Sequence, residues 1–342
     1  MKVLVAMSGG VDSSVAAALL LQEGHDVVGA TMKLWGGAGD SGCCSVGDVE
    51  DARRVAQQLG IVHHVFNFSD DFDARVVGPY VADHAAGRTP NPCIECNRLL
   101  KFDRMLARAD RLGFDAVATG HHARVRSAPD GRLQLWRATD RAKDQSYVLH
   151  MLGQAQLARC RFPVGDLTKP EVRARAAELG LRTAAKPDSQ EVCFITSTGG
   201  RVAFLGDRLP LHAGRAVDVA GREVGRVDAV ELVTVGQRRG LGGGGGSRRY
   251  AIAVDPAART VTVGTEEDLL TDAVALTDMC WVDGPVTGDV LVQRSAHGEV
   301  RQASFGGQVV RFERPARRVA AGQSVVLYDG DRVLGGGRAV TP

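Results

Sequence analysis

The residues best suited to chemistry stand near the start of the chain, in the segment Ser8-Gly9-Gly10-Val11-Asp12-Ser13. An apolar run leads into this segment, and a helix-forming run, VAAALLLQEG, follows it. A strand, a glycine turn and a helix together present backbone N–H groups at a helix N-terminus, where phosphate oxygens bind well. Gly9 and Gly10 are both expected to take positive φ angles that leave room for a bulky anion. The segment therefore predicts a nucleotide site, in which Asp12 either serves a metal-bound pyrophosphate or caps the helix.

The pattern around the glycines narrows the kind of nucleotide site. No Gly-Lys-Ser or Gly-Lys-Thr follows the loop, which excludes a Walker A loop. A later glycine-rich stretch, residues 240–249, contains GxGxxG, but a strand is expected after it, so we interpret it as a flexible loop tip rather than a dinucleotide site. The motif SGGxDS resembles the PP-loop of the ATP pyrophosphatases. That resemblance implies cleavage of ATP to AMP and pyrophosphate, with a substrate oxygen activated by adenylation.

Three cysteines form a second set of reactive side chains. Cys93 and Cys96 lie in TPNPCIECN, a loop stiffened by prolines, and a helix is expected directly after it. The positive end of that helix is expected to lower the pKa of the Cys96 thiol. Cys193 follows a Pro-Asp turn in KPDSQEVCF. These thiols suit either sulfur-transfer chemistry or ligation of an iron–sulfur cluster with one open iron, and both alternatives stay open.

Other uses of the cysteines fit less well. A zinc site would need a second CxxC or an HxxxH at a matching spacing, and the chain has neither. The prolines beside Cys93 make a thioredoxin-like redox pair a poor match. Cys160 and Cys280 are expected to be buried structural residues, and residues 43 and 44, both cysteines, are expected to lie in a packed loop.

The composition is typical of a soluble globular protein. The chain has 342 residues, 44% hydrophobic and 24% charged, which favours two or three domains. No apolar run predicts a membrane span or a signal peptide. Seven unevenly spaced cysteines argue against a secreted disulfide framework and favour reduced thiols in the cytoplasm. Only six of the 42 basic residues are lysine, but an arginine excess also follows from a GC-rich genome, so composition does not predict nucleic-acid binding.

Strands and helices alternate through the first part of the chain, which predicts an α/β fold with a doubly wound, mostly parallel sheet. Strands are expected at 3–6, 26–34, 61–68 and 115–122, and helices at 48–60, 72–86, 98–113, 145–152 and 170–179. The last strand brings Gly120 and His121 to the sheet edge of Ser8. Beyond residue 205, short β-type runs between turns predict further β-rich units. We expect a PP-loop catalytic domain at 1–200, a small β-rich linking domain at 201–268 and a C-terminal β-barrel at 269–342.

Together the two sites predict a reaction in which adenylation activates an oxygen and a cysteine-borne sulfur replaces it. At this level the chain resembles the tRNA-specific 2-thiouridylases, which replace O2 of the wobble uridine by sulfur at the expense of ATP. The resemblance runs nearly end to end, through SGGVDSS, SGCCS, DARRVAQQLGI, GRTPNPCIECNRLLKF, ATGHHAR, KDQSYVL, FPVGDLTKPEVR, KPDSQEVCFI, VGQRRGL and GQSVVLYDG. It implies an adenine-nucleotide hydrolase-like catalytic domain and a tRNA sulfurtransferase.

The resemblance also implies roles for individual residues. Cys193 would carry a persulfide received from a cysteine desulfurase, directly or through a sulfur-relay protein, and Cys96 would act as the nucleophile, leaving a Cys96–Cys193 disulfide after each turnover. ATP with Mg2+ would be held by Ala6, Met7, Ser8, Gly9, Gly10, Val11, Asp12, Ser13, Met32 and Gly120. The tRNA would be contacted by Asn91, Pro92, Cys93, His121, Lys143, Asp144, Gln145, Arg294, Ser295 and Gln323. A cytoplasmic monomer without membrane association is expected.

Two departures from the family pattern bear on the mechanism. Some members have aspartate, proposed as an acid/base group, where this chain has Cys93; with Cys96 and Cys193 this thiol could complete a [4Fe–4S] site. The stretch VQRSAHG lacks the Arg-Tyr-Arg run expected at the tRNA-contacting turn of the barrel. Three other interpretations remain: a PP-loop synthetase that forms an amide or amine, a tRNA-binding sulfur or cluster carrier, and a thiolase for another tRNA base.

Overall fold

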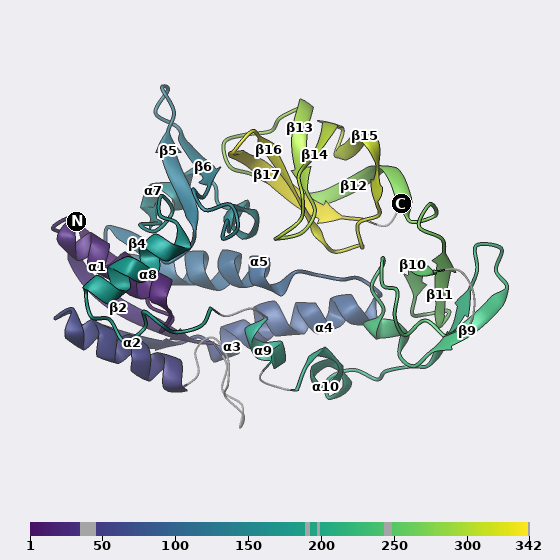
Figure 1. Cartoon of the computed structure of the whole chain (residues 1–342), viewed down its shortest axis with the longest axis horizontal. Coiled ribbons are helices and arrows are strands. Elements are labelled where there is room, and N and C mark those ends of the chain that lie inside the picture. Colours follow the sequence, from purple (N-terminus) through teal and green to yellow (C-terminus); the bar gives the residue numbers. More distant parts are fainter. Residues whose placement is uncertain (35–45, 189–191, 197–198, 243–247, 341–342) are drawn as a thin grey trace.

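A computed structural model describes residues 1–34, 46–188, 192–196, 199–242 and 248–340. The cysteine pair at 43 and 44 and the middle of the glycine-rich stretch lie outside the described residues. Figure 1 shows three regions: a parallel sheet with its helices near the N-terminus, a small β unit, and a barrel that lies over a long layer of helices. In the described part of the chain, no helix has the length and apolar character that a membrane crossing requires.

The N-terminal sheet has the order β3-β2-β1-β4-β7, and its pairings are parallel. Its strands are β1 (Lys2–Ala6), β2 (Asp26–Lys33), β3 (His63–Asn67), β4 (Ala116–Thr119) and β7 (Cys160–Arg161). Because side chains alternate along a strand, Val3 and Val5 enter one apolar core and Leu4 and Ala6 enter the other. The predicted doubly wound sheet, with helices on both faces, is confirmed.

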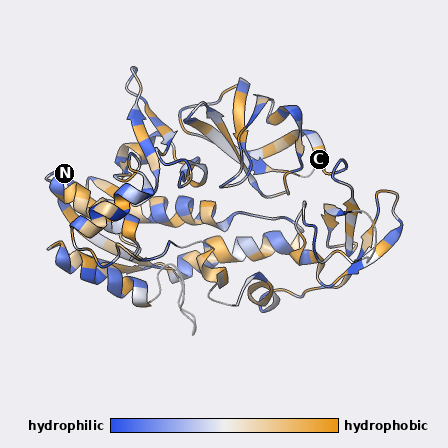
Figure 2. Cartoon of the chain, in the orientation of Figure 1, coloured by the Kyte–Doolittle hydropathy of each residue, from blue (hydrophilic) through white to orange (hydrophobic). Residues whose placement is uncertain are grey.

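The helices divide between the two faces of this sheet. The core of Val3 and Val5 takes in α1 (Val11–Gln22), α2 (Val46–Gln58) and α8 (Lys169–Glu178). The core of Leu4 takes in α3 (Ser69–Phe72), η1 (Asp73–Val77), α4 (Gly78–Ala85), α5 (Pro92–Cys96), η2 (Asn97–Arg104) and α6 (Met105–Arg111). Figure 2 shows α1 coloured largely hydrophobic, in keeping with its buried run of valine, alanine and leucine. The helical segment from α5 to α6 is continuous, since each element begins where the previous one ends.

Short helices connect the larger units: η3 (Ser146–Leu149), α7 (Gln154–Arg159), α9 (Cys193–Thr196), α10 (Arg201–Gly206) and η4 (Val230–Leu232). The helix expected at 145–152 is therefore only a 3-10 turn. Its first N–H, that of Ser146, donates to the Asp144 side chain at 3.2 Å. This side-chain bond competes with a regular helix in the way that is usual for aspartate at turns.

The middle unit is a four-stranded sheet in the order β10-β11-β8-β9. Its strands are β8 (Gly214–Val217), β9 (Glu223–Val227), β10 (Tyr250–Asp255) and β11 (Thr260–Gly264). Ala216, Val261 and Val263 belong to its own small apolar core. The predicted β-rich central unit is thus present.

The C-terminal strands are β12 (Leu270–Trp281), β13 (Gly288–Gln293), β14 (Arg301–Gly306), β15 (Val309–Arg317), β16 (Ser324–Asp329) and β17 (Arg332–Ala339). Their order around the barrel is β12-β15-β14-β13-β16-β17, and the barrel of six strands is closed because β12 also pairs with β17. The predicted barrel is confirmed. A hairpin of β5 (Ala123–Ser127) and β6 (Leu133–Arg137), far earlier in the chain, extends the same sheet through pairs such as Val333 with Leu135.

Candidate active site

The PP-loop motif lies between β1 and α1, at the carboxyl end of the central strand of the sheet. Gly9 has the positive φ that was expected, +71°, and a Cβ there would stand 2.3 Å from the Asp48 carbonyl oxygen. Gly10 differs from the expectation: its φ is −95°, and it occupies the N-cap of α1. Because glycine offers no side chain to cap the helix, the N–H groups of its first turn remain for a ligand. The loop has the form of an anion site with one left-handed glycine rather than two.

Hydroxyl groups and a close strand approach hold the loop against the helix. Ser13 Oγ accepts from Ser8 N at 3.2 Å, and Ser14 Oγ donates to Gly10 O at 2.8 Å. At the end of β4, a Cβ on Gly120 would lie 2.5 Å from Ser13 N. Glycine at position 120 is therefore required for the strand to come this close to the start of α1.

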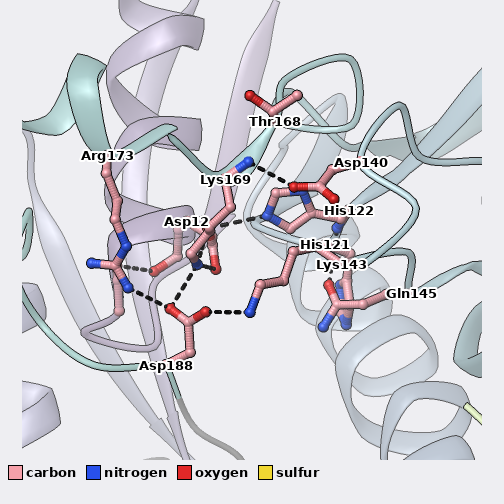
Figure 3. A network of polar contacts seen from close by, with 12 residues as sticks. Asp12, His121, His122, Asp140, Lys143, Gln145, Thr168, Lys169, Arg173 and Asp188 are labelled. Carbon is pink, nitrogen blue, oxygen red and sulfur yellow. Dashed lines mark hydrogen bonds and ion pairs between the residues drawn. The ribbon is translucent and has the colours of Figure 1, made fainter. Parts of the chain in front are cut away.

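A network of ion pairs surrounds Asp12 (Figure 3). Lys169 Nζ donates to the two carboxylate oxygens of Asp12 at 2.7 and 2.8 Å, and His122 Nε2 donates to one of them at 3.2 Å. Burial raises the pKa of Asp12, but hydrogen bonds and charge from His122 and Lys169 outweigh burial and hold that pKa below its usual value. Asp12 is thus an ionised carboxylate in the first turn of α1, whose cap is Gly10.

Asp188 extends this network. Its carboxylate pairs with Lys143, Lys169 and Arg173, each at 2.8 Å (Figure 3). Burial raises the pKa of Asp188, but Lys143 and Lys169 lower it to about 2. Lys143, Lys169 and Arg173 thus gather beside the positive end of α1, and basic side chains at a helix N-terminus suit a chain of phosphates.

Sequence reasoning missed most of the residues that hold this network. Lys169 opens α8, where Thr168 caps the helix and Glu171 completes a capping box. Lys186 Nζ donates to Gly9 O at 3.0 Å and to both Asp48 and Asp51 at 2.7 Å. The only signal was the presence of these lysines in the motifs TKPEVR and KPDSQ. Nothing in their spacing indicates that Lys169 returns to a residue 157 positions earlier.

The helix that carries Cys93 and Cys96 begins earlier than expected. Asn91 caps α5 by accepting from Cys93 N at 3.1 Å, and Pro92 occupies the first turn, where proline is well tolerated. Cys93 is exposed in that first turn, whereas Cys96 is buried one turn later. The expectation that the helix N-terminus acts on Cys96 is therefore wrong, because the position nearest the positive end of the dipole belongs to Cys93.

Cys193 reaches the apolar core that contains Cys96. Cys96 is 8% exposed within the core, and Cys193 packs half-buried against it. Phe194 anchors this segment, with ring centroids 4.9 Å from Phe204, 5.5 Å from Phe72 and 5.6 Å from Tyr80. The structure thus brings to one apolar core two cysteines that the sequence places about a hundred residues apart.

Within the described part of the chain, Cys93, Cys96 and Cys193 do not form a ligand set for a metal. Among the described residues, which include Cys93, Cys96 and Cys193, no three His, Cys, Asp or Glu side chains are grouped so that they could hold a metal ion. The trio therefore does not fit the [4Fe–4S] site considered from the sequence. Cys160 is 1% exposed and burial raises its pKa to about 12, as expected of a structural cysteine, whereas Cys280 is only half-buried.

Several residues expected to contact tRNA are enclosed. The ring of His121 is buried, its Nδ1 lies 2.6 Å from Thr119 Oγ1, and burial holds its pKa well below the usual value. The Asp144 carboxylate accepts from Arg137, Ala138 and Ser146 inside the protein. Beside it, Lys143 pairs with Asp188 and the Gln145 side chain accepts from His122 N at 2.9 Å.

The barrel residues lie on two turns. Arg294 and Ser295 follow β13; burial lowers the pKa of Arg294, as do the like charges of Arg301 and Arg317. Gln323 precedes β16, in a turn where the Ala321 carbonyl accepts from Thr89 N at 2.7 Å. The second turn is thereby joined to the segment that leads into α5, where Asn91, Pro92 and Cys93 lie together.

Comparisons with known proteins match all three regions. A family model described as tRNA methyl transferase HUP domain matches residues 1–197, one described as tRNA methyl transferase PRC-barrel domain matches 202–265, and one described as aminomethyltransferase beta-barrel domain matches 291–339. The chain is 49% identical over 353 residues to the tRNA-specific 2-thiouridylase MnmA of Chloroflexus aurantiacus, covering 99% of this chain and 98% of that protein. It is 47% identical to the protein of that name from Roseiflexus sp., with 98% of each chain covered, and 44% identical to that from Heliobacterium modesticaldum, covering 99% and 92%.

Proposed function

We propose, from the premise that this chain belongs to the family of tRNA-specific 2-thiouridylases, that it replaces O2 of the wobble uridine of tRNA by sulfur. The coarser assignment, an ATP-dependent tRNA uridine sulfurtransferase, follows from the family itself. The observation that carries it is the identity of 49% over 99% of the chain.

The first step takes place at the PP-loop. Uridine O2 attacks the α-phosphorus of ATP, the bond to pyrophosphate breaks, and the proton of uridine N3 is lost. The N–H groups of α1 and the charge of Lys169 would bind the phosphates, with Lys169 passing from Asp12 to a phosphate oxygen. Mg2+ needs one or two carboxylates besides phosphate oxygens and water, and Asp12 supplies one at the loop. Bound there, Mg2+ would neutralise charge on the leaving pyrophosphate.

The second step belongs to the thiol cluster. The outer sulfur of a Cys193 persulfide attacks C2 of the adenylated uridine and AMP leaves. The Cys96 thiolate then attacks Cys193 Sγ, the persulfide bond breaks, and 2-thiouridine is released with a Cys96–Cys193 disulfide in place. Packing of both cysteines against one core supports this pairing. An external thiol must reduce the disulfide before the next turnover.

The start of α5 is where we propose that the target base lies. Asn91, Pro92 and the exposed Cys93 stand there, one turn from Cys96. RNA-modifying enzymes take a target base out of its stack into such a site. Cys93 stands in the first turn of α5, and as a thiolate, the form that the positive end of a helix favours, it would accept the N3 proton.

The partners follow from this chemistry. A persulfide on Cys193 would be supplied by a cysteine desulfurase or a sulfur-relay protein, and the need for tRNA and for a thiol reductant supports a cytoplasmic location. All the residues of the proposed mechanism come from a single chain, so a monomer suffices.

The proposal is tested by reconstitution. Purified protein is incubated with an unmodified tRNA transcript, ATP with Mg2+, a persulfide donor and a thiol reductant, and the digested nucleosides are analysed by mass spectrometry. We expect one 2-thiouridine, one AMP and one pyrophosphate per tRNA, and none with a transcript whose wobble base is cytidine. Sulfur at another base, or thiolation without pyrophosphate release, would contradict the proposal.

A further inference from the structure

An arginine with a largely enclosed side chain, outside the proposed mechanism, joins the barrel to the loop beside the PP-loop. Arg137 is the last residue of β6, and its side chain is only 12% exposed. One guanidinium nitrogen donates to Asp144 Oδ2 at 3.1 Å and another donates to Gln293 Oε1 at 2.7 Å. The same guanidinium lies 3.9 Å from the ring centroid of Tyr328. Arg137 thus contacts the catalytic domain and two strands of the barrel at once.

On the barrel side, the contact continues to the turn after β13. Gln293 is 2% exposed, and its amide nitrogen donates to the carbonyls of Ser295 at 2.9 Å and Ala296 at 3.1 Å. The amide oxygen is the atom that accepts from Arg137. The amide of Gln293 therefore bonds both to the turn that carries Arg294 and Ser295 and to Arg137.

On the catalytic side, the contact continues through Asp144. Its carboxylate, only 5% exposed, accepts from Ala138 N at 2.9 Å and from the Ser146 hydroxyl at 2.9 Å, so the loop that contains Lys143 and Gln145 is held at both ends. Gln145 is bonded in both directions to the backbone of His122, at 2.8 and 2.9 Å.

From these two residues the hydrogen bonds reach the PP-loop. The His122 ring donates to Asp12, and Lys143 pairs with the Asp188 that also binds Lys169. Along this path from the carbonyls of the barrel turn to the carboxylate of Asp12, each hydrogen bond is 3.2 Å or shorter, and the peptide bond between Asp144 and Gln145 joins the two groups of hydrogen bonds.

We propose that Arg137 is a positioning residue that couples the docking of tRNA at the barrel turn 294–296 to the alignment of the PP-loop for adenylation. This inference rests on the proposed function, because it takes the turn and the loop at 143–145 as parts of the tRNA-binding face. The physical reason lies in the fork of the guanidinium, which binds an acid and an amide in fixed directions, whereas a lysine is a single point charge. Small displacements of reacting groups slow a reaction strongly. The contacts of Arg137 should therefore affect turnover more than they affect substrate binding.

The experiment measures coupling directly. Arg137→Lys, Gln293→Leu and the double variant are compared with wild type for tRNA-dependent pyrophosphate release at saturating substrates. Dissociation constants for ATP and for tRNA are measured separately. Arg126→Lys, on the same hairpin but exposed and paired with Asp166, is the matched control. Gln293→Leu leaves the Arg137–Asp144 pair in place, so it tests the proposal even if Arg137→Lys does not fold.

We expect each single variant to lose about tenfold in turnover, the order of one buried charge-assisted hydrogen bond, with both dissociation constants within about threefold of wild type. The double variant should be no worse than the worse single variant, because both changes break the same link. Unchanged turnover in folded variants, additive losses, or a loss confined to tRNA affinity would each overturn the proposal. A wild-type protein that releases no pyrophosphate with tRNA would instead refute the proposed function.

Discussion

The two halves of the proposed site are held in opposite ways. Around the PP-loop, Asp12, Lys169 and Asp188 form a network of ion pairs, and each side chain is placed by charge. Around the thiols, Cys96 lies within an apolar core and Cys193 packs against that core, next to Phe194 with its aromatic contacts. The difference matches the chemistry proposed for each half, since phosphates need donors and positive charge, whereas the resolution of a persulfide needs a second thiol close to it.

The largest effect is expected when the reactive thiols of one half of the site are removed. Cys96→Ser and Cys193→Ser should each abolish thiolation, because an alcohol can neither carry nor resolve a persulfide. Release of pyrophosphate in a single turnover should continue in both variants, since the PP-loop is untouched. Thiolation is measured by nucleoside mass spectrometry and adenylation by pyrophosphate release. Cys160→Ser, at a buried structural cysteine, is the control for a loss of packing rather than of chemistry. Near-normal thiolation by either the Cys96 or the Cys193 variant would contradict the assignment.

Removing the other half should give the converse result. Lys169→Met should lower tRNA-dependent pyrophosphate release by about a hundredfold, the loss of one charge that stabilises the transition state. The sulfur-accepting step should remain, so Cys193 should still take up labelled sulfur from a persulfide donor. Arg175→Met, an exposed position on the same helix paired with Glu178, is the control. Equal losses in the Lys169 and Arg175 variants would point to damage to α8 in general.

A smaller effect is expected when the aromatic packing beside Cys193 is weakened. Phe194→Leu leaves an apolar residue but removes ring contacts to Phe72, Tyr80 and Phe204, and should cost about 1–2 kcal/mol of unfolding free energy. Sulfur transfer should slow more than adenylation, because Cys193 is the neighbouring residue. Denaturant unfolding and the two activity assays measure the three quantities. An equal slowing of both steps would show that the cluster does not position Cys193 specifically.

The smallest expected effect concerns pH and the charged half alone. The pKa of Asp188 is lowered from 3.8 to about 2 in the folded protein. Its ion pairs therefore stabilise the fold fully when the pH is above the pKa that Asp188 has in the unfolded chain, and this stabilisation is lost as the pH falls toward 2. Asp188→Asn should therefore be less stable than wild type at pH 6, with the difference shrinking as pH falls below about 4. Unfolding free energies at several pH values check this. A difference that does not change with pH would mean that the carboxylate charge is not what matters.

The sequence predicted the local parts of the molecule well. Alternation and turn residues indicated the parallel sheet around β1, and the SGGVDS motif indicated the loop after it, because both depend on neighbours in the chain. Asn91 and Pro92 also carried the signal for an earlier start of α5, since an asparagine cap followed by proline is a helix N-terminus. Interpreting the segment as a stiff loop instead puts Cys96 just before the helix, whereas in the structure Cys96 lies one turn inside it.

The sequence by itself determined which reactive groups the protein has: a glycine loop at a helix N-terminus, thiols in turn-rich segments, and motifs shared with a tRNA-modifying family. Only the tertiary structure decided which of these residues meet. It brought Lys169 and Asp188 to Asp12, placed Cys193 against the core of Cys96, and joined Arg137 to the barrel. The physical reason is that ion pairs and apolar contacts act through space, so partners far apart in the chain leave no periodic signal in it, whereas helices, strands and turns are set by residues a few positions apart.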